Sequence, residues 1–382
     1  MFSPDNFVEQ LGLNQAYRLI RWSDPPITPR VIEFLDTQDT FLSGTIYIAE
    51  EKSAKNFFMQ HEVVVYPGVL LLTTDATGEP PEFPDNLTVL GFFDTLGKVY
   101  NLLSTYIDTP AVRDNSRRFS EILDEIIVNP MLSTNEIRGK LNDLSGMQGQ
   151  FASIFVLVFT GSPKSDIPYT RIMKQIEALI PNCCAAVYGK EIIFLTTYDE
   201  RRFDYPYEFE QITAIIEKYD GYMVISNGTR HLYALRALYL MTQRIITIAR
   251  ELEVATDTRI FTFERLSTYL AIDLCSRGLD AFAGSDELMY LAHPAIVAIS
   301  RYDNKNNDNL RGVLYFYLFH DRSIKRTADA LFMHRNTVMN KVKKINQLFN
   351  IDFEDRHLRQ RLLFSCQLAK YYEGMGKILK NE

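Results

Sequence analysis

Several features that mark secreted, membrane and zinc-binding proteins are missing from this sequence of 382 residues. No run of about 18 apolar residues without a charge occurs, and the best candidate, 151–159, has the length of a strand. The four cysteines form no CxxC pair, so neither a disulfide framework nor a zinc knuckle is expected. The first ten residues lack the basic and apolar segments of a signal peptide. These absences favour a protein of the reducing cytoplasm, without contact to a membrane.

Catalytic signatures are equally scarce. The sequence contains no G-x-x-x-x-G-K-[ST] phosphate loop, no G-x-S-x-G nucleophile elbow and no H-E-x-x-H zinc motif. Its six histidines are scattered along the chain, which gives a metal cluster no support. We therefore predict a protein that is not an enzyme and has no catalytic residue, no cofactor and no metal site.

Positive charge is also scarce, except in one short segment. The formal net charge is −7, and residues 1–95 carry 14 acidic and 5 basic side chains. Residues 322–346, in contrast, carry seven basic side chains and a single acidic one, Asp329. A basic segment of this kind in an acidic protein indicates a nucleic-acid module, while the acidic remainder disfavours indiscriminate coating of DNA.

The first part of the chain, 1–95, alternates strand and helix patterns. Apolar strands are expected at 44–49, 69–74 and 87–93, with a helix over 50–60. Near-continuous apolar strands are typical of a sheet that is covered on both faces, so we predict an α/β domain. Such a domain ahead of an output module suggests small-molecule sensing, and a purely structural or dimerising role is the alternative.

Residues 96–148 predict connector helices. Apolar residues recur at helical spacing before and after Pro110, which interrupts the pattern, and Ser133 with Glu136 forms a capping box. Helices at a domain junction can pair with the same helices of a second chain or pack on their own chain, and the sequence leaves both open.

The middle region, 149–300, has the clearest topology. Strands are expected at 151–159, 183–188, 191–197 and 222–226, with a hairpin turn at Gly189-Lys190 and helices over 166–180 and 206–219. The order β-α-β-β-α-β is that of the ferredoxin-like unit. A long helix over 232–253 and a strand at 260–263 follow.

The last part, 301–382, is predicted to be helical, with helices over 309–320, 323–333, 336–349 and 355–373. The polar run 303–309 is expected to be a linker or an exposed loop, in which Asp308 or Asn309 caps the following helix.

The second and third of these helices predict a helix-turn-helix. Val338, Val342, Ile345 and Phe349 would form the buried face of the recognition helix. Amide side chains on its other face suit adenine, and basic side chains suit phosphates. A solvated basic helix hairpin in a bundle is the alternative interpretation. The contacts predicted from this chemistry are Lys325, Arg326, Arg335, Asn336, Thr337, Asn340, Lys341, Lys343 and Lys344.

The stretch from Leu310 to Leu368 resembles the C-terminal helix-turn-helix of the PucR/CdaR family of bacterial transcription regulators. The most specific part of the resemblance is His334-Arg335-Asn336-Thr337-Val338, with Thr327-Ala328 before it and Lys344-Ile345 after it. The resemblance implies DNA contacts at Thr327 and His334 as well. The chain departs from the family at 339–341, which puts the target sequence in doubt.

The middle region resembles the degenerate GGDEF-like domain of the same family. Ile225 to Gly228 and the long helix that follows carry this resemblance. The signature hairpin is reduced to Tyr188-Gly189-Lys190-Glu191-Ile192, which lacks the acidic residue for Mg²⁺ and the second glycine. The resemblance therefore implies a domain without cyclase activity.

Together these features predict a multidomain α/β plus all-α protein: a sensor, a connector, a degenerate GGDEF-like domain and a helix-turn-helix bundle. We expect a cytoplasmic, sequence-specific transcription regulator that binds double-stranded DNA, responds to a small-molecule effector and forms a homodimer. The alternative is a nucleotide-binding signalling protein whose helical tail is an interaction module.

Overall fold

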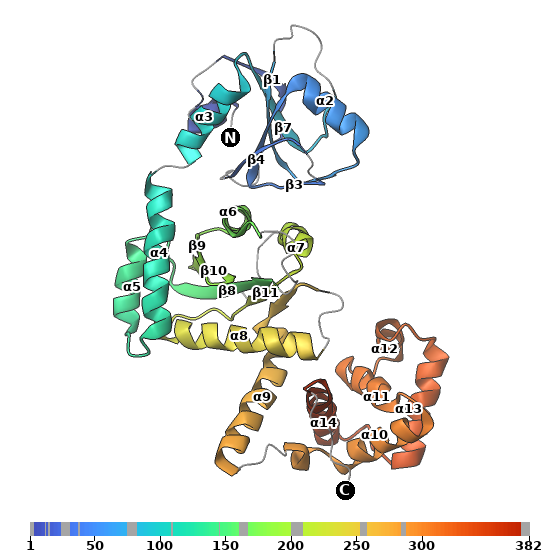
Figure 1. Cartoon of the computed structure of the whole chain (residues 1–382). Helices are drawn as coiled ribbons and strands as arrows, with labels where there is room; N and C mark the ends of the chain where they lie inside the picture. The colour runs from blue at the N-terminus through green and yellow to red at the C-terminus, as the bar shows by residue number, and fades with distance from the viewer. Residues whose placement is uncertain are drawn as a thin grey trace. The chain divides into compact units, whose positions relative to one another are not determined.

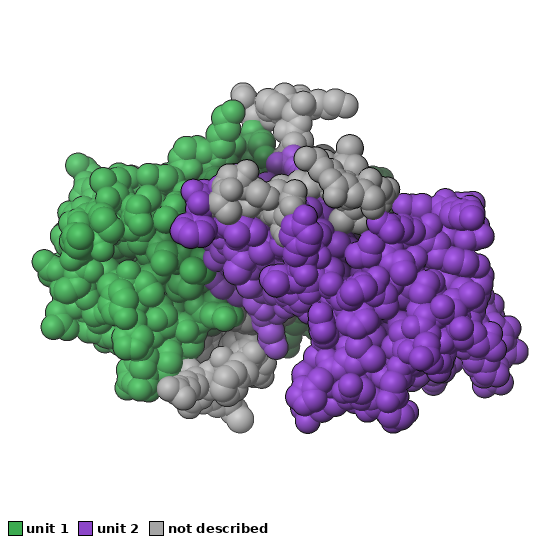
Figure 2. All heavy atoms as spheres, turned by 90° about the horizontal axis from the view of Figure 1, so that it is seen from below, with its two compact units in different colours: residues 1–243, 259–262 green, residues 244–258, 263–382 purple. Residues whose placement is uncertain are grey.

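Two compact units make up the chain in the computed structural model (Figures 1 and 2). The first unit contains Met1–Gln243 and Arg259–Thr262, and the second contains Arg244–Thr258 and Phe263–Glu382. The structure describes residues 4–11, 13, 16–23, 31–36, 39–74, 82–107, 110–144, 146–159, 167–199, 209–252, 258–283 and 288–375. The predicted starts of two helices, at 166 and 206, lie outside these ranges.

The N-terminal part of the first unit is built on a five-stranded sheet with the order β1-β7-β6-β4-β2. All neighbours are parallel except the edge pair β1 and β7. A separate two-stranded sheet pairs β3 with β5. The strands are β1 (Tyr17–Arg21), β2 (Val31–Phe34), β3 (Thr40–Phe41), β4 (Thr45–Glu50), β5 (Val64–Val65), β6 (Gly68–Thr73) and β7 (Leu87–Phe92).

Burial along β4 explains why this sheet needs helices on both faces. Ile46 and Ile48 pack with α1 (Pro4–Gln10) and α3 (Leu96–Ile107), whereas Tyr47 and Ala49 pack on the opposite face with α2 (Glu51–Gln60). Successive side chains of a strand point to opposite faces, so a continuous apolar run requires two covering layers. The α/β prediction for residues 1–95 is confirmed in this coarse sense.

The connector forms α4 (Pro110–Val128) and α5 (Thr134–Asn142). Pro110 begins α4, because proline is tolerated in the first turn of a helix, where no hydrogen-bond donor is needed. The capping box is present, with the Glu136 amide donating to Ser133 Oγ over 3.3 Å. Phe119, Leu123 and Ile126 are buried, and α4 packs on β9 (Cys183–Tyr188) of its own chain. This face of α4 therefore packs within its own chain, which is one of the two arrangements that the sequence left open.

The middle part of the first unit contains β8 (Phe151–Phe159), α6 (Tyr169–Leu179), β9, β10 (Glu191–Tyr198), α7 (Phe209–Lys218) and β11 (Gly221–Ile225). Its sheet has the order β12-β11-β8-β10-β9, with β12 (Ile260–Thr262) parallel to β11 and all other neighbours antiparallel. Both α6 and α7 bury their apolar faces in one core with this sheet. The hairpin turns at Gly189, whose φ of 62° favours glycine.

An ion pair joins the N-terminal five-stranded sheet to α6, with the carboxylate of Glu33 buried and the side chain of Arg171 half exposed. Arg171 of α6 donates from Nε and Nη2 to the two carboxylate oxygens of Glu33 on β2, each over 2.8 Å. Gln175 Nε2 adds a third hydrogen bond to Glu33 over 2.6 Å. Gly44 allows the close approach, because a Cβ there would lie 2.6 Å from Ala178 Cβ.

A long helix leads from the first unit into the second. It consists of the 3₁₀ turn η1 (Leu232–Ala234) and α8 (Leu235–Glu251). The second unit continues with α9 (Phe263–Ala283), η3 (Leu288–Leu291), α10 (Pro294–Asn306), α11 (Leu310–Phe319), α12 (Ile324–Ala330), α13 (Arg335–Phe349) and α14 (Arg356–Gly374).

The polar run 303–309 differs from its prediction as a linker. Residues up to Asn306 belong to α10, and Ile296 and Ile299 of this helix enter the core formed by α11, α13 and α14. The helix ends at Asn307 with a φ of 50°, and Asn309 caps α11 by accepting the Gly312 amide over 3.0 Å. Helical residues therefore replace most of the expected linker, because one face of α10 is apolar.

Candidate nucleic-acid interface

Helices α12 and α13 cross closely over a small apolar core. Ala328 and Val338 are buried against Val313 of α11, and Ala328 is small enough to allow the crossing. Ser323 Oγ accepts the Arg326 amide over 3.3 Å at the start of α12. At the start of α13, His334 Nδ1 accepts the Asn336 amide over 3.3 Å. These contacts form a helix-turn-helix.

The buried face of α13 is the predicted one. Val338 and Ile345 are buried, and Val342 and Phe349 are partly buried. This burial determines which side chains face the solvent. Most of the predicted contact residues are exposed, namely Lys325, Arg326, His334, Arg335, Asn336, Thr337, Asn340 and Lys343.

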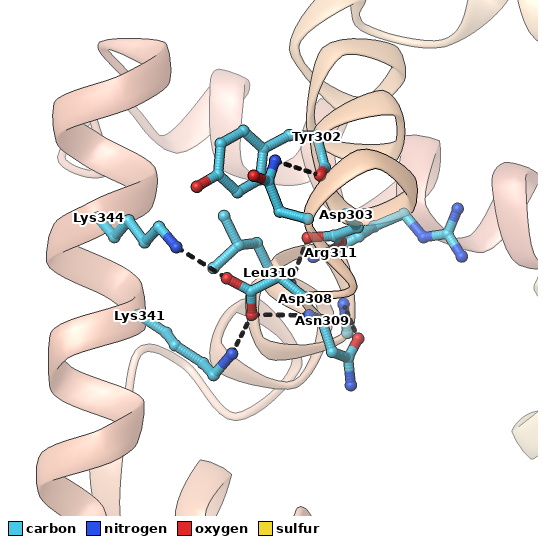
Figure 3. A network of polar contacts seen from close by, with 10 residues as sticks. Tyr302, Asp303, Asp308, Asn309, Leu310, Arg311, Lys341 and Lys344 are labelled. Atoms are coloured by element: carbon cyan, nitrogen blue, oxygen red, sulfur yellow. Dashed lines mark hydrogen bonds and ion pairs between the residues drawn. The ribbon is translucent and has the colours of Figure 1, made fainter.

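Three predicted contact residues are engaged elsewhere. Thr327 is fully buried, and its hydroxyl donates to the Ser323 carbonyl over 2.8 Å, so it supports α12 from inside. Lys341 and Lys344 both bind the carboxylate of Asp308, which lies in the loop between α10 and α11 (Figure 3).

Asp308 was identified in the sequence only as a candidate cap. Its Oδ2 accepts Lys344 Nζ over 2.8 Å, and its Oδ1 accepts Lys341 Nζ and, over 2.8 Å, the Asn309 amide. The hydrogen bonds from Lys341 and Lys344 lower the pKa of this carboxyl group well below its usual range. The same ion pair raises the pKa of Lys344. The sequence carried no signal for this contact, because it joins residues more than 30 positions apart.

The basic segment divides accordingly into two groups. Arg322 pairs with Glu354 over 2.5 Å, and Lys341 and Lys344 pair with Asp308, so these three are partly neutralised. Lys325, Arg326, Arg335 and Lys343 form no side-chain hydrogen bond or ion pair with any residue that the structure describes. Four exposed cations on α12 and α13, together with the exposed side-chain amides of Asn336 and Asn340, are thus left without a partner among the described residues.

The acidic residue of the hairpin between β9 and β10, Glu191, takes part in a structural contact. Glu191 accepts hydrogen bonds from Gln243 Nε2 over 2.6 Å and from the Tyr239 hydroxyl over 3.2 Å. Burial raises the pKa of Glu191, and these two hydrogen bonds oppose the shift. Its carboxylate therefore attaches the long helix to the hairpin.

Within the described ranges, no group of three or more His, Cys, Asp or Glu side chains has a geometry that could hold a metal ion. No helix in the described part of the chain is long and apolar enough to cross a membrane.

Comparisons with known proteins place the helical region in a family. Residues 310–368 match the family described as the PucR C-terminal helix-turn-helix domain. The proline-responsive transcriptional activator PutR of Bacillus subtilis is 24% identical over 149 residues, which are 39% of this chain. The match spans only 34% of the length of PutR.

A crystal structure of a regulator of polyketide synthase expression from Bifidobacterium adolescentis also matches. The similarity covers 68% of this chain and 98% of that chain, at 18% sequence identity and a TM-score of 0.29. The matched segment 310–368 runs from α11 to α14 and contains the whole of α12 and α13. Residues 310–368 therefore match the PucR C-terminal helix-turn-helix domain.

Proposed function

We propose that the chain is a cytoplasmic, sequence-specific transcription regulator that binds double-stranded DNA with α13 in the major groove. The observation that carries the proposal is that α12 and α13 expose four unpaired cations and, on α13, the amides of Asn336 and Asn340. A helix of this size fits the major groove, where each base pair has a distinct pattern of donors and acceptors.

The exposed side chains divide naturally into two roles. Asn336 and Asn340 lie one helical turn apart on the same side of α13, and asparagine can form two hydrogen bonds with adenine. Lys325 and Arg326 at the start of α12, with Lys343, suit the phosphates on either side of the groove. Arg335 and Thr337 belong to the first turn of α13, whose free amides also favour phosphate.

For the rest of the chain we propose the division 1–95, 96–148, 149–300 and 301–382. Residues 1–95 bind a small-molecule effector, and 149–300 form a ferredoxin-like, degenerate GGDEF domain without cyclase activity. The strand order supports the ferredoxin-like part of this assignment, and the occupied carboxylate of Glu191 supports the absence of catalysis. The ion pair of Glu33 and Arg171 gives the proposed effector domain a direct contact to the middle domain.

We further propose that the protein acts as a homodimer, since two half-sites about 34 Å apart multiply the selectivity of one small module. The effector would change the relative placement of two helix-turn-helix domains. Because the apolar face of α4 is already buried within its own chain, the dimer contact would use another surface.

The test is selection of binding sites from random double-stranded DNA with the purified full chain. Enrichment of one motif, as an inverted or direct repeat, is expected for a dimer that reads sequence. Light scattering of the selected complex would give two chains per DNA. Failure to enrich any motif would contradict the proposal.

A further inference from the structure

We propose that Asp308 is a positioning residue for DNA recognition, which holds α13 through Lys341 and Lys344 and keeps these two cations away from phosphates. The inference rests on the proposed DNA-binding function. It assigns a role to an acidic residue outside the helix-turn-helix and reassigns two lysines from DNA contact to scaffold.

Several hydrogen bonds hold the loop that carries Asp308 (Figure 3). The Asn309 amide donates to Asp308 Oδ1 over 2.8 Å, and Asn309 caps α11. Asp303, in the last turn of α10, accepts the amides of Leu310 and Arg311, each over 2.8 Å. Two carboxylates and one amide side chain thus tie the end of α10 to the start of α11, so Asp308 is a fixed anchor point.

The ion pairs to this anchor are partly shielded from solvent. The side chain of Asp308 is 14% exposed, that of Lys341 is 22% exposed and that of Lys344 is 41% exposed. Lys344 Nζ also lies over the ring of Tyr302, 5.0 Å from its centroid. An ammonium group held by a carboxylate and an aromatic face is less free to turn towards another anion than a solvated lysine.

The positions of the two lysines on α13 explain why the contact orients the helix. Asn336, Asn340 and Lys343 lie on one side of α13, whereas Lys344 lies about a fifth of a turn away and Lys341 about a third of a turn away. Two attachments one turn apart oppose rotation of α13 about its own axis. The amides can therefore keep a constant angle to the bases of the groove.

The contact of Asp308 with Lys341 and Lys344 also limits the affinity of the chain for DNA of random sequence. Each phosphate that a cation neutralises adds about 0.9 to the slope of log affinity against log salt concentration. With Lys341 and Lys344 occupied by Asp308, the interface relies on Lys325, Arg326, Arg335 and Lys343. Asp308 thus favours selected sites over random DNA.

The test compares Asp308→Asn with Asp329→Asn in the full chain. Asp329 is exposed on α12 and forms no side-chain contact with the described residues. Asp329→Asn makes the same change of charge as Asp308→Asn, and is therefore the matched control. Binding to a selected site and to random DNA is measured over a range of salt concentrations. Asp308→Asn should lower the ratio of the two affinities at least tenfold and steepen the salt slope for random DNA. Asp329→Asn should leave the ratio unchanged.

A second variant keeps the inference testable if Asp308→Asn fails to fold. The double substitution Lys341→Gln and Lys344→Gln should lower the ratio by a similar factor without flattening the salt slope on selected DNA. A slope flattened by about two phosphates would mean that the lysines bind DNA directly, and would overturn the inference. An unchanged ratio in Asp308→Asn would also overturn it. A wild-type chain that selects no sequence contradicts the proposed function instead.

Discussion

Arg244 of α8 and Asp273 of α9 form a two-point ion pair in the interior of the second unit. Arg244 Nε donates to Asp273 Oδ2 over 2.7 Å, and Nη2 donates to Oδ1 over 2.5 Å. The Tyr371 hydroxyl of α14 donates to Oδ1 over 2.7 Å. Asp273 is fully buried. Its carboxylate joins α8, α9 and α14, because it accepts hydrogen bonds from the first and the last of these helices. This contact holds three helices of the second unit together.

We expect Asp273→Ala to destabilise the second unit by about 3 kcal/mol. Removing one partner of a buried pair leaves the other charge uncompensated, and the partial exposure of Arg244 places the cost at the lower end of the usual range. Urea unfolding followed by circular dichroism measures the change. Asp280→Ala, an exposed aspartate on the same helix, is the matched control and should change stability by less than about 0.5 kcal/mol.

The same carboxylate predicts a loss of stability in acid. Burial alone would raise the pKa of Asp273, but hydrogen bonds from Arg244 and Tyr371 outweigh it and lower the pKa. A carboxylate with a lowered folded pKa contributes stability above its unfolded value of about 3.9 and loses it as the pH falls below that value. We expect the melting temperature to fall less steeply towards acid pH for Asp273→Asn than for the wild type, when it is measured from roughly pH 2 to pH 7. Equal acid slopes would contradict this assignment.

Local patterns in the sequence predicted most of the secondary structure, because helices and strands depend on nearby residues. The two faces of β4, the capping box at Ser133 and the buried face of α13 followed from spacing alone. The sequence could also identify the helix-turn-helix, since its caps and its small crossing residue, Ala328, are close together in the chain.

Contacts between distant residues could not be predicted in the same way. Thr327 is buried and its hydroxyl donates to the Ser323 carbonyl, although the family resemblance implies a DNA contact at this position. Lys341 and Lys344 pair with Asp308, which follows α10 and lies far from them in the sequence. A count of basic residues therefore overestimates the number of cations that have no ion-pair partner. The polar run at the end of α10 predicts a linker, because the apolar residues that hold this helix in the core, Ile296 and Ile299, lie before the run.

Phe332, in the turn between α12 and α13, offers a prediction about stability. This residue is 98% exposed and has a φ of 51°, a left-handed conformation that disfavours residues with a Cβ. Phe332→Gly should therefore stabilise the helix-turn-helix by about 1 kcal/mol, since little packing is lost. Amide hydrogen exchange of α12 and α13 measures the local change. Phe332→Ala removes the ring but keeps the Cβ, so it should give no such gain; equal protection in both variants would contradict the strain argument.

The final prediction concerns the exposed side of α13. Asn336→Ala and Asn340→Ala should each reduce discrimination at one base position by about 1–3 kcal/mol, because each removes a pair of hydrogen bonds to a base edge. Asn346→Ala is the matched control, since this exposed asparagine of α13 lies away from the proposed face. Lys343→Ala should weaken binding to all sequences alike and lower the salt slope by about 1. Binding to a set of single-base variants of the selected site, measured at several salt concentrations, separates the two effects. If Asn346→Ala altered base preference while Asn336→Ala and Asn340→Ala did not, α13 would present a different side to the groove, and the anchoring at Asp308 would have to be reinterpreted with it.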